Sequence, residues 1–376
     1  MIVRCHPAPG AASERGPRFG TLDVMSATPT TSMTGAERML ATALRQPADR
    51  TPVWFMRQAG RCLAGYRALR ETYDILTITR TPELCAQVTL MPVVEFGVDA
   101  AVMYADIMLP LTGMGVPFSI DPGIGPIIHA PVRSEADVAA LRIVDPREST
   151  PELFEAIRLV RRQLEGKTAL VGFAGGPFTV ASYMIEGKPT KEFSRTKAML
   201  HGEPALWHRL MTTLTEVTIS YLQAQVEAGA QMIQLFDSWA GALSVGAYEQ
   251  SVLPYSRRII EAVAETGVPT IHFGTTTSHL LESMARCGSD VISVDWRLPL
   301  DEAWRRIGDR AIQGNLDPGV MLAPFDVIAR EARQILALAA GRPGHIFNLG
   351  HGVLPETSSD DLRRLVALVH EETARA

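Results

Sequence analysis

Two arginines four residues apart are the first feature of this chain that could do chemistry. Arg57 and Arg61 end the stretch "PVWFMRQAGR", which begins as an apolar run at Pro52. A guanidinium is planar and permanently charged, so it can bind a carboxylate through two parallel hydrogen bonds, which a lysine does less selectively. The alternative interpretation is a structural ion pair at a helix start.

Other polar residues follow other apolar runs. Asp106 comes after "AAVMY", Asp237 and Ser238 come after "QMIQLF", and His351 lies between two glycines after "HIFNL". Tyr183 lies farther downstream of "TALVGF". Taken singly, each has a plain interpretation as a capping, packed or backbone-bonded residue. They indicate a site only if the fold brings them together.

The elements that must position these residues repeat one theme, a short apolar run followed by a stretch with helical spacing. The runs lack strict alternation, as expected of strands buried on both faces. They predict an α/β fold whose parallel sheet closes as a (β/α)8 TIM barrel, with its chemistry at the carboxyl ends of the strands. The eight runs cover residues 52–56, 100–104, 168–173, 231–236, 269–273, 291–296, 311–315 and 345–349.

Helices are expected over residues 81–97, 205–229, 326–341 and 358–372. Two of them begin with residues suited to a helix start. Thr81 supplies a capping hydroxyl before Pro82 and Glu83, and Ser358 precedes two aspartates. Hydroxyl caps, proline in the first turn and acids near the positive end of the helix dipole all favour these starts.

Composition limits the possible partners. The net charge is −5 without long charged blocks, and 46% of the residues are hydrophobic, which is ordinary for a soluble globular protein and favours neither nucleic acid nor a membrane as partner. The four cysteines have no paired spacing, which indicates a reducing, cytoplasmic location and no structural metal site. We expect residues 1–32 to be a disordered leader, with a transit peptide as the weaker alternative, and residues 33–376 to form one domain.

Six motifs occur in order, each at a predicted strand end, and together they are far more specific than any one of them. With them the chain closely resembles the uroporphyrinogen decarboxylase family of tetrapyrrole synthesis, from Ala36 to the end. The motifs are "PVWFMRQAGR", "YADIMLPLTGMG", "GFAGGPFTVASYMIEG", "QLFDSWAG", "QGNLDPG" and "NLGHG".

The resemblance implies a homodimeric enzyme that needs no cofactor or metal. It would remove the four acetate carboxyls of uroporphyrinogen III to give coproporphyrinogen III. Arg57, Asp106 and His351 are implied as catalytic residues. The residues implied in substrate binding are Arg57, Gln58, Ala59, Gly60, Arg61, Asp106, Tyr183, Ser238 and His351.

Asp106 suits the centre of such a substrate, because an ionised carboxylate only accepts hydrogen bonds and the four pyrrole N–H groups only donate them. Loss of CO2 also needs an electron sink, which protonation of the pyrrole at carbon creates as a cation. A fixed anion beside that cation stabilises it as it forms. The alternative for Asp106 is a helix cap or a salt bridge at the barrel mouth.

Three proton donors stay open. The resemblance favours Arg57, whose deprotonation at pH 7 costs about 7.5 kcal/mol. His351 and a relayed water are the rivals, with the pKa of histidine nearer working pH. The stretch 186–197 is rich in Lys and Arg and could be a mobile cover over the site or a solvated helix start.

The family pattern is broken in two places. Cys62-Leu63-Ala64-Gly65 stands where the family has Tyr-Leu-Pro-Glu, and Ala105 replaces a serine. Without the proline we expect a looser loop.

Two rival functions are a zinc- or corrinoid-linked methyltransferase of the same fold and a non-catalytic tetrapyrrole carrier. The first needs a thiolate where this chain has Gly274. The second would tolerate loss of Asp106, and a turnover assay separates it from an enzyme.

Overall fold

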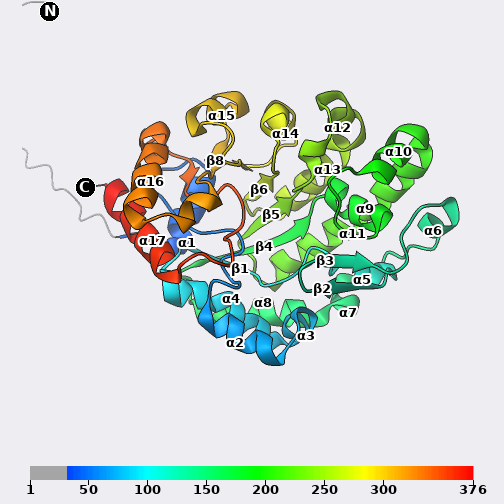
Figure 1. The fold of residues 1–376 in the computed structure, drawn as a ribbon, viewed down its shortest axis with the longest axis horizontal. Helices are drawn as coiled ribbons and strands as arrows, with labels where there is room; N and C mark the ends of the chain where they lie inside the picture. The colour runs from blue at the N-terminus through cyan, green and yellow to red at the C-terminus, as the bar shows by residue number, and fades with distance from the viewer. Residues whose placement is uncertain (1–31, 376) are drawn as a thin grey trace, which may run out of the picture. The chain divides into compact units, whose positions relative to one another are not determined.

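Seven parallel strands lie side by side in chain order in the computed structural model, which describes residues 32–375 (Figure 1). They form one curled sheet with helices around its outer side. All seven runs predicted from residue 100 onward overlap one of these strands, so the α/β class with a parallel sheet is confirmed. The strands are β1 (Ala100–Val102), β4 (Ala169–Gly175), β5 (Met232–Phe236), β6 (Thr270–Phe273), β7 (Val291–Ser293), β8 (Ala311–Gln313) and β9 (His345–Ile346).

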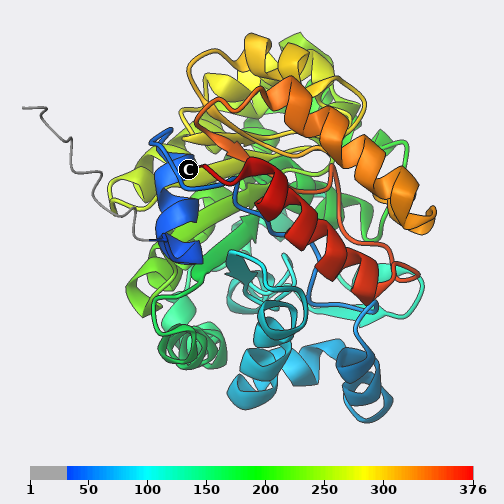
Figure 2. The same ribbon diagram turned by 90° about the vertical axis from the view of Figure 1, so that its left-hand side faces the viewer.

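Helices connect the strands, and the four helices predicted from spacing are present with ends shifted by at most two residues. Figure 2 shows two of them, α16 and α17, side by side on the outer surface. No helix among residues 32–375 is long and apolar enough to cross a membrane. The helices are α1 (Gly35–Ala43), α2 (Ala64–Thr72), α3 (Ile75–Arg80), α4 (Pro82–Phe96), α5 (Leu111–Met114), α6 (Glu135–Ala139), α7 (Pro146–Ser149), α8 (Pro151–Leu164), α9 (Pro177–Glu186), α10 (Ser194–Gly202), α11 (Pro204–Ala228), α12 (Val245–Ser251), α13 (Leu253–Ala264), α14 (Leu281–Ala285), α15 (Leu300–Ile307), α16 (Phe325–Ala339) and α17 (Ser359–Thr373), with 3-10 turns η1 (Ala240–Ala242), η2 (Ser278–Leu280) and η3 (Pro318–Leu322).

The two predicted caps have different outcomes. Ser358 caps α17 as expected, because its hydroxyl accepts from the Asp361 N–H at 3.3 Å. Thr81 is the residue before α4, but its hydroxyl donates to the Thr77 carbonyl at 2.9 Å and makes no cap bond. The side chain is used by the preceding helix α3, so this part of the prediction was wrong.

The first predicted strand, 52–56, is not a regular strand but an isolated bridge between Val53 and Phe347. On one side the Phe347 N–H donates to the Pro52 carbonyl at 2.9 Å. On the other side the Asp99 N–H, directly before β1, donates to the Val53 carbonyl at 2.8 Å. Residues 52–54 therefore hydrogen-bond beside both edge strands of the sheet, next to β9 on one side and next to β1 on the other. Strand pairing stops there because the chain turns at Phe55, whose carbonyl accepts from the Gln58 N–H at 3.1 Å.

A buried polar network joins this segment to the sheet. Trp54 Nε1 donates to Gln313 Oε1 at 2.9 Å, and Gln313 Nε2 donates to Gln234 Oε1 at 3.0 Å and to Ser293 Oγ at 2.9 Å. These four side chains come from the first segment and from β5, β7 and β8. Because an unpaired buried amide is costly, the network fixes the position of residue 54 relative to the strands.

A buried ion cluster lies between α1, α17 and the start of β1. Asp99 is paired with Arg38 of α1, and both side chains are 3% exposed. Arg38 also donates to Asp49, at 2.6 Å, and the second Asp99 oxygen accepts from the Val53 N–H at 2.7 Å. His370 Nε2 of α17 lies 2.8 Å from the same oxygen. One carboxylate therefore ties α1, α17 and the first segment to the start of β1.

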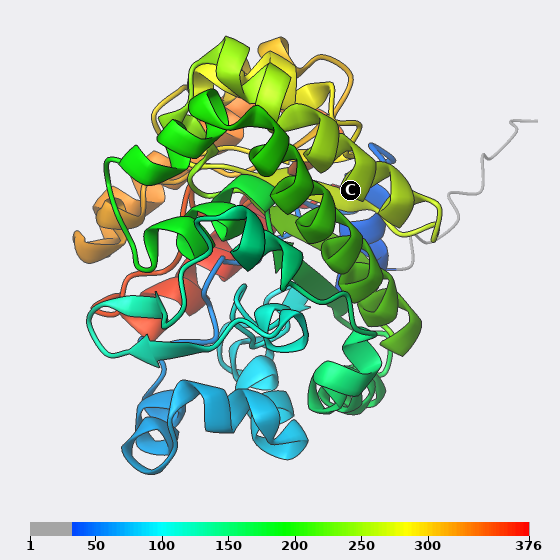
Figure 3. The ribbon, with the colours of Figure 1, turned by 90° about the vertical axis from the view of Figure 1, so that its right-hand side faces the viewer.

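A two-stranded hairpin of β2 (Phe118–Asp121) and β3 (Gly125–Ile128), which the sequence analysis did not predict, lies beside α9 (Figure 3). The Ile128 N–H donates to the Gly187 carbonyl at 2.7 Å, and the Val132 N–H donates to the Met184 carbonyl at 2.9 Å. Within the stretch 186–197, Glu186 Oε1 at the end of α9 accepts from the Thr196 N–H of α10 at 2.9 Å, so this bond joins the two ends of the connecting loop. The predicted leader, apart from Ser32, lies outside the described residues.

Removing the charge of Asp99 should destabilise the fold. We expect Asp99→Asn to lower the free energy of unfolding by about 3 kcal/mol, because it leaves part of the Arg38 charge buried without its partner. Urea denaturation measures this loss. The control is Asp309→Asn, since Asp309 is 98% exposed and its bond to Arg45 should contribute almost nothing. Equal urea midpoints for the two variants would contradict the prediction.

Candidate active site

Arg57 and Arg61 lie on the turn that follows the first segment. Both side chains are exposed, and neither has a carboxylate within ion-pair distance among residues 32–375. The structural ion pair considered from the sequence is therefore not seen in the described part of the chain. Arg57 has a left-handed backbone, φ +59°, which is uncommon for a residue with a side chain.

Gln58 holds this turn from the inside. Its side chain is 1% exposed, with Oε1 accepting from the Phe55 N–H at 3.0 Å and Nε2 donating to the Ala100 carbonyl at 2.9 Å. The side-chain amide is thus used within the protein, and any substrate contact at Gln58 would be through its backbone. Ala59 and Gly60 are half-buried in the same turn.

Asp106 follows β1 and is only partly exposed. Its Oδ1 accepts from the Met108 N–H at 2.9 Å. Burial raises the pKa of Asp106, while the Met108 N–H and the positive charge of Arg57 both lower it. The carboxylate is therefore surrounded by protein, with a cation near it.

Tyr183 and Ser238 are brought together by neighbouring elements. Tyr183 lies on α9, and its ring stacks on Trp239 at a centroid distance of 4.1 Å and an interplanar angle of 28°. Ser238 precedes Trp239 in the loop after β5. Burial and, less strongly, the charge of Asp106 raise the pKa of Tyr183 to about 12, against the opposing effect of Arg57. Tyr183 is therefore a neutral hydrogen-bond donor.

His351 lies in the loop after β9, between Gly350 and Gly352. Burial and the charge of Arg57 lower the pKa of His351 to about 4, so its imidazole is neutral at pH 7. A Cβ built on Gly352 would overlap the side chain of Arg57, so the missing side chain at 352 leaves the space that Arg57 occupies.

Arg57 is the common neighbour of Asp106 and His351, which are predicted to be catalytic, and of Tyr183, which is predicted to bind substrate. Its charge influences the pKa of Asp106, of Tyr183 and of His351. These three side chains therefore lie within electrostatic reach of Arg57. Together these groups suit an anionic ligand. The guanidinium, the phenol and the neutral imidazole can bind a polyanion, and the carboxylate can accept from hydrogen-bond donors.

Comparison with known proteins decides the family. The family model described as "Uroporphyrinogen decarboxylase (URO-D)" matches residues 34–372. The chain belongs to the uroporphyrinogen decarboxylase family. It is 51% identical to the protein named uroporphyrinogen decarboxylase in Sorangium cellulosum, over 89% of this chain and 96% of that protein. It is also 51% identical to the protein of the same name in Thermus thermophilus, over 89% and 98%.

Solved structures share the fold at low identity. A methyltransferase from Methanosarcina mazei superposes with a TM-score of 0.77 at 22% identity, over 90% of this chain and 99% of that one. A B12-independent methionine synthase from Shewanella sp. W3-18-1 gives a TM-score of 0.55 at 11% identity, over 80% and 90%. These likenesses show the fold alone. Among residues 32–375 no three His, Cys, Asp or Glu side chains cluster closely enough to hold a metal ion.

In this member of the uroporphyrinogen decarboxylase family, three packed phenylalanine rings form an aromatic row beside the site, which was not predicted from the sequence. Phe173 packs edge-on against Phe236 at 5.4 Å, Phe236 against Phe273 at 5.6 Å, and Phe273 lies 6.1 Å from the ring of His351. Phe236 and Phe273 are the last residues of β5 and β6. An aromatic residue at the end of a predicted strand is therefore the sequence feature from which the row could have been predicted. Phe173 and Phe273 are buried, so only Phe236 adds a partly exposed apolar side chain next to the charges at this end of the sheet.

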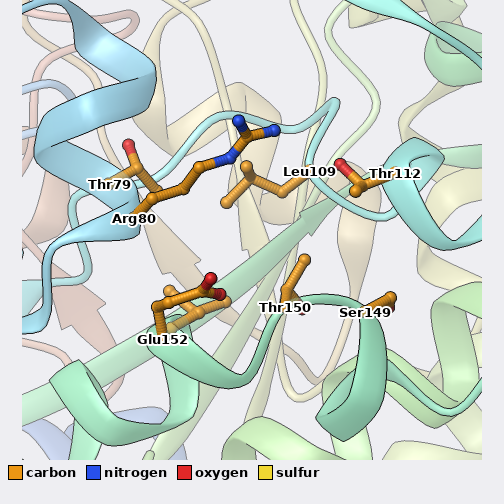
Figure 4. Close-up of a pocket in the computed structure, with 8 residues that line it drawn as sticks. Thr79, Arg80, Leu109, Thr112, Ser149, Thr150 and Glu152 are labelled. Carbon is orange, nitrogen blue, oxygen red and sulfur yellow. The ribbon is translucent and has the colours of Figure 1, made fainter.

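Two cavities lie away from these residues. Figure 4 shows one of about 250 Å³, which touches Leu109, three residues after Asp106. A second, of about 400 Å³, lies between α4 and α8. Neither is lined by a predicted site residue. The residues that line the first are Thr79, Arg80, Leu109, Thr112, Ser149, Thr150, Glu152 and Leu153.

The neutral state of His351 can be measured directly. We expect an NMR titration to give a midpoint at about pH 4, and we expect Arg57→Gln to raise it because one cause of the lowered pKa is removed. The signal of the exposed His201 should be the same in both proteins. Since the folded pKa lies below the unfolded one, the folded state also loses stability as pH falls from about 6.5 toward 4. A parent midpoint near 6.5 would contradict this assignment.

Proposed function

We propose that this chain catalyses the cofactor-free removal of the four acetate carboxyls of uroporphyrinogen III, giving coproporphyrinogen III. The observation that carries the proposal is the exposed guanidinium of Arg57 within electrostatic reach of Asp106 at the carboxyl end of the sheet. About 51% identity to proteins named uroporphyrinogen decarboxylase supports it.

Arg57 and Arg61 bind substrate carboxylates in this proposal. Each has a free guanidinium in the described part of the chain, so binding an anion breaks no internal ion pair. Tyr183 and His351, both neutral, donate hydrogen bonds to further carboxylates, with Ser238 beside them. Phe236, the partly exposed member of the aromatic row, suits contact with one face of the macrocycle.

Asp106 accepts hydrogen bonds from the pyrrole N–H groups. A proton added to the pyrrole carbon next to an acetate arm makes the ring a cation. The C–C bond to the carboxylate then breaks, CO2 leaves, and the electron pair neutralises the ring. A proton then converts the arm to methyl, and the ring carbon loses the proton that it gained. Each CO2 is thus replaced by one proton, and the negative charge of Asp106 stabilises the cation.

Protonating His351 at pH 7 would cost about 4 kcal/mol, because its pKa is about 4. This cost removes about half of the advantage of about 7 kcal/mol that an ordinary histidine pKa would give His351 over Arg57. Because the imidazole is neutral at pH 7, its remaining N–H is a hydrogen-bond donor and not a ready acid. We therefore propose His351 as a hydrogen-bond donor to substrate, and Arg57 or a relayed water as the acid.

The proposal extends to the architecture. Residues 52–54 serve as the eighth member that closes a (β/α)8 barrel, an interpretation supported by their hydrogen bonds toward Phe347 and Asp99. Residues 33–376 act as one catalytic domain, and the enzyme works as a cytoplasmic homodimer, as the family resemblance implies.

Replacing Asp106 by asparagine should separate catalysis from stability. We expect Asp106→Asn to lower turnover of uroporphyrinogen III at least about 100-fold, because the anion beside the ring cation is lost. Its melting temperature should be equal to or above that of the parent. Since burial raises the pKa of Asp106, the ionised form costs stability above the unfolded pKa, and asparagine removes that cost.

Chromatography of products from anaerobically prepared substrate measures the rate, and calorimetry measures the melting temperature. Asp309→Asn, an exposed change of the same type, should match the parent in both. Undiminished turnover by Asp106→Asn would refute the assigned role. A parent that binds substrate without turnover would instead favour a carrier.

Replacing Arg57 by lysine keeps the charge but loses the fork of donors. We expect Arg57→Lys to raise KM about tenfold, because a carboxylate held by two parallel bonds is then held by one. Arg45→Lys, an exposed change on α1's C-terminal side, should leave KM unchanged. An unchanged KM in Arg57→Lys would show that this guanidinium does not bind the substrate.

A further inference from the structure

Asp237 is fully buried and lies between the end of β5 and Ser238. Its N–H donates to the Phe273 carbonyl at 2.8 Å, which fixes its backbone against β6. Its Oδ1 accepts from both the N–H of Thr179, at 3.1 Å, and the hydroxyl of Thr179, at 2.8 Å. The side chain therefore bonds to a different element from its own.

This carboxylate acts as the cap of α9. The residue at the cap position is Gly176, which has no side chain to accept from the first free N–H groups. Asp237 supplies the acceptor from the neighbouring strand, at the positive end of the helix dipole. A Cβ on Gly176 would come within 2.5 Å of Asp237 Cβ and Cγ, so only glycine allows this approach.

The Thr179 hydroxyl links Asp237 to Trp239. It donates to Asp237 and at the same time accepts from the Trp239 N–H at 3.1 Å. Trp239 in turn stacks on Tyr183, which lies one helical turn after Thr179 on α9. Phe193 packs edge-on against the same indole at 5.2 Å. The orientation of Tyr183 is thus tied to Asp237 through two hydrogen bonds and one ring stack.

We infer that Thr179 and Asp237 are positioning residues that orient Tyr183 and Ser238 for the substrate carboxylates, an inference that rests on the function proposed above. Neither residue touches substrate. Their hydrogen bonds join α9, which carries Tyr183, to the loop after β5, which carries Ser238, and so fix the spacing of two side chains from different elements.

The test uses a matched pair at one position. Thr179→Val keeps the shape but removes the hydroxyl that joins Asp237 to Trp239, whereas Thr179→Ser keeps that hydroxyl. We expect Thr179→Val to lower kcat/KM for uroporphyrinogen III about tenfold, mainly through KM, because a misplaced phenol loses its bond to a carboxylate. Thr179→Ser should stay within about twofold of the parent.

A double-mutant cycle with Tyr183→Phe separates positioning from general stability. If Thr179 acts through the phenol, Thr179→Val should cost less than about threefold in the Tyr183→Phe background. An equal loss in both backgrounds, or a lower melting temperature with unchanged KM, would overturn the inference. Should Thr179→Val not fold, Trp239→Leu removes the stack from a partly exposed position and carries the same expectations in the same cycle.

A crystal structure of Thr179→Val, or of Trp239→Leu in its place, reports on the inference without an assay. We expect the ring of Tyr183 to leave its present orientation, while Thr179→Ser retains the stack at 4.1 Å. An unmoved Tyr183 would overturn the inference even if the enzyme is active. Parent turnover, measured separately, decides the proposed function, so the two can fail independently.

Discussion

The positive charge of Arg57, placed beside a protein-surrounded carboxylate, is the interaction on which the rest of the site depends. It opposes the effect of burial on Asp106, and it helps to keep His351 neutral. Holding it there requires a left-handed backbone at residue 57, which costs of order 1 kcal/mol or more. The surrounding turn compensates, because both the oxygen and the nitrogen of the Gln58 amide hydrogen-bond to the backbone, and Gly352 leaves space for the aliphatic part of the Arg57 side chain.

The same constraint explains why residues 52–54 are bonded on both sides. Arg57 can face Asp106 only if residues 52–54 stay beside β1, and Asp99 holds them there through the Val53 N–H. It can face His351 only if the same residues stay beside Phe347, which they do through backbone hydrogen bonds. The ion cluster of Arg38, Asp99 and His370 is therefore part of the geometry of the site, although it lies at the other end of the strands.

The sequence predicted the parallel sheet because its strands are continuous apolar runs, and such runs depend on local composition. It also placed Arg57, Asp106 and His351 after predicted strands, where a parallel sheet collects side chains, with Tyr183 farther downstream of another. The first run failed as a regular strand because the turn that exposes Arg57 ends the pairing after Trp54. The hairpin of β2 and β3 was missed because its strands are half-buried and do not form continuous apolar runs.

What the sequence could not predict depends mainly on contacts between distant residues. The amide of Gln58 bonds to Ala100, and the low pKa of His351 comes from burial and from a charge almost 300 residues away. The role of Asp237 as a cap is of the same kind, since the helix that it caps begins some 60 residues earlier in the chain. None of these leaves a local pattern.

The close approach of Arg57 to the loop of His351 and Gly352 has a consequence for synthesis on the ribosome. A nascent chain that has emerged only as far as β8 carries Arg57 and Asp106 but lacks the glycine-flanked loop that lies against the aliphatic part of the Arg57 side chain. In the function proposed above, the site for the macrocycle is therefore complete only once translation is nearly finished. A ligand that binds only the finished fold then favours it by mass action, so the metabolite itself can act as a folding aid for newly made enzyme.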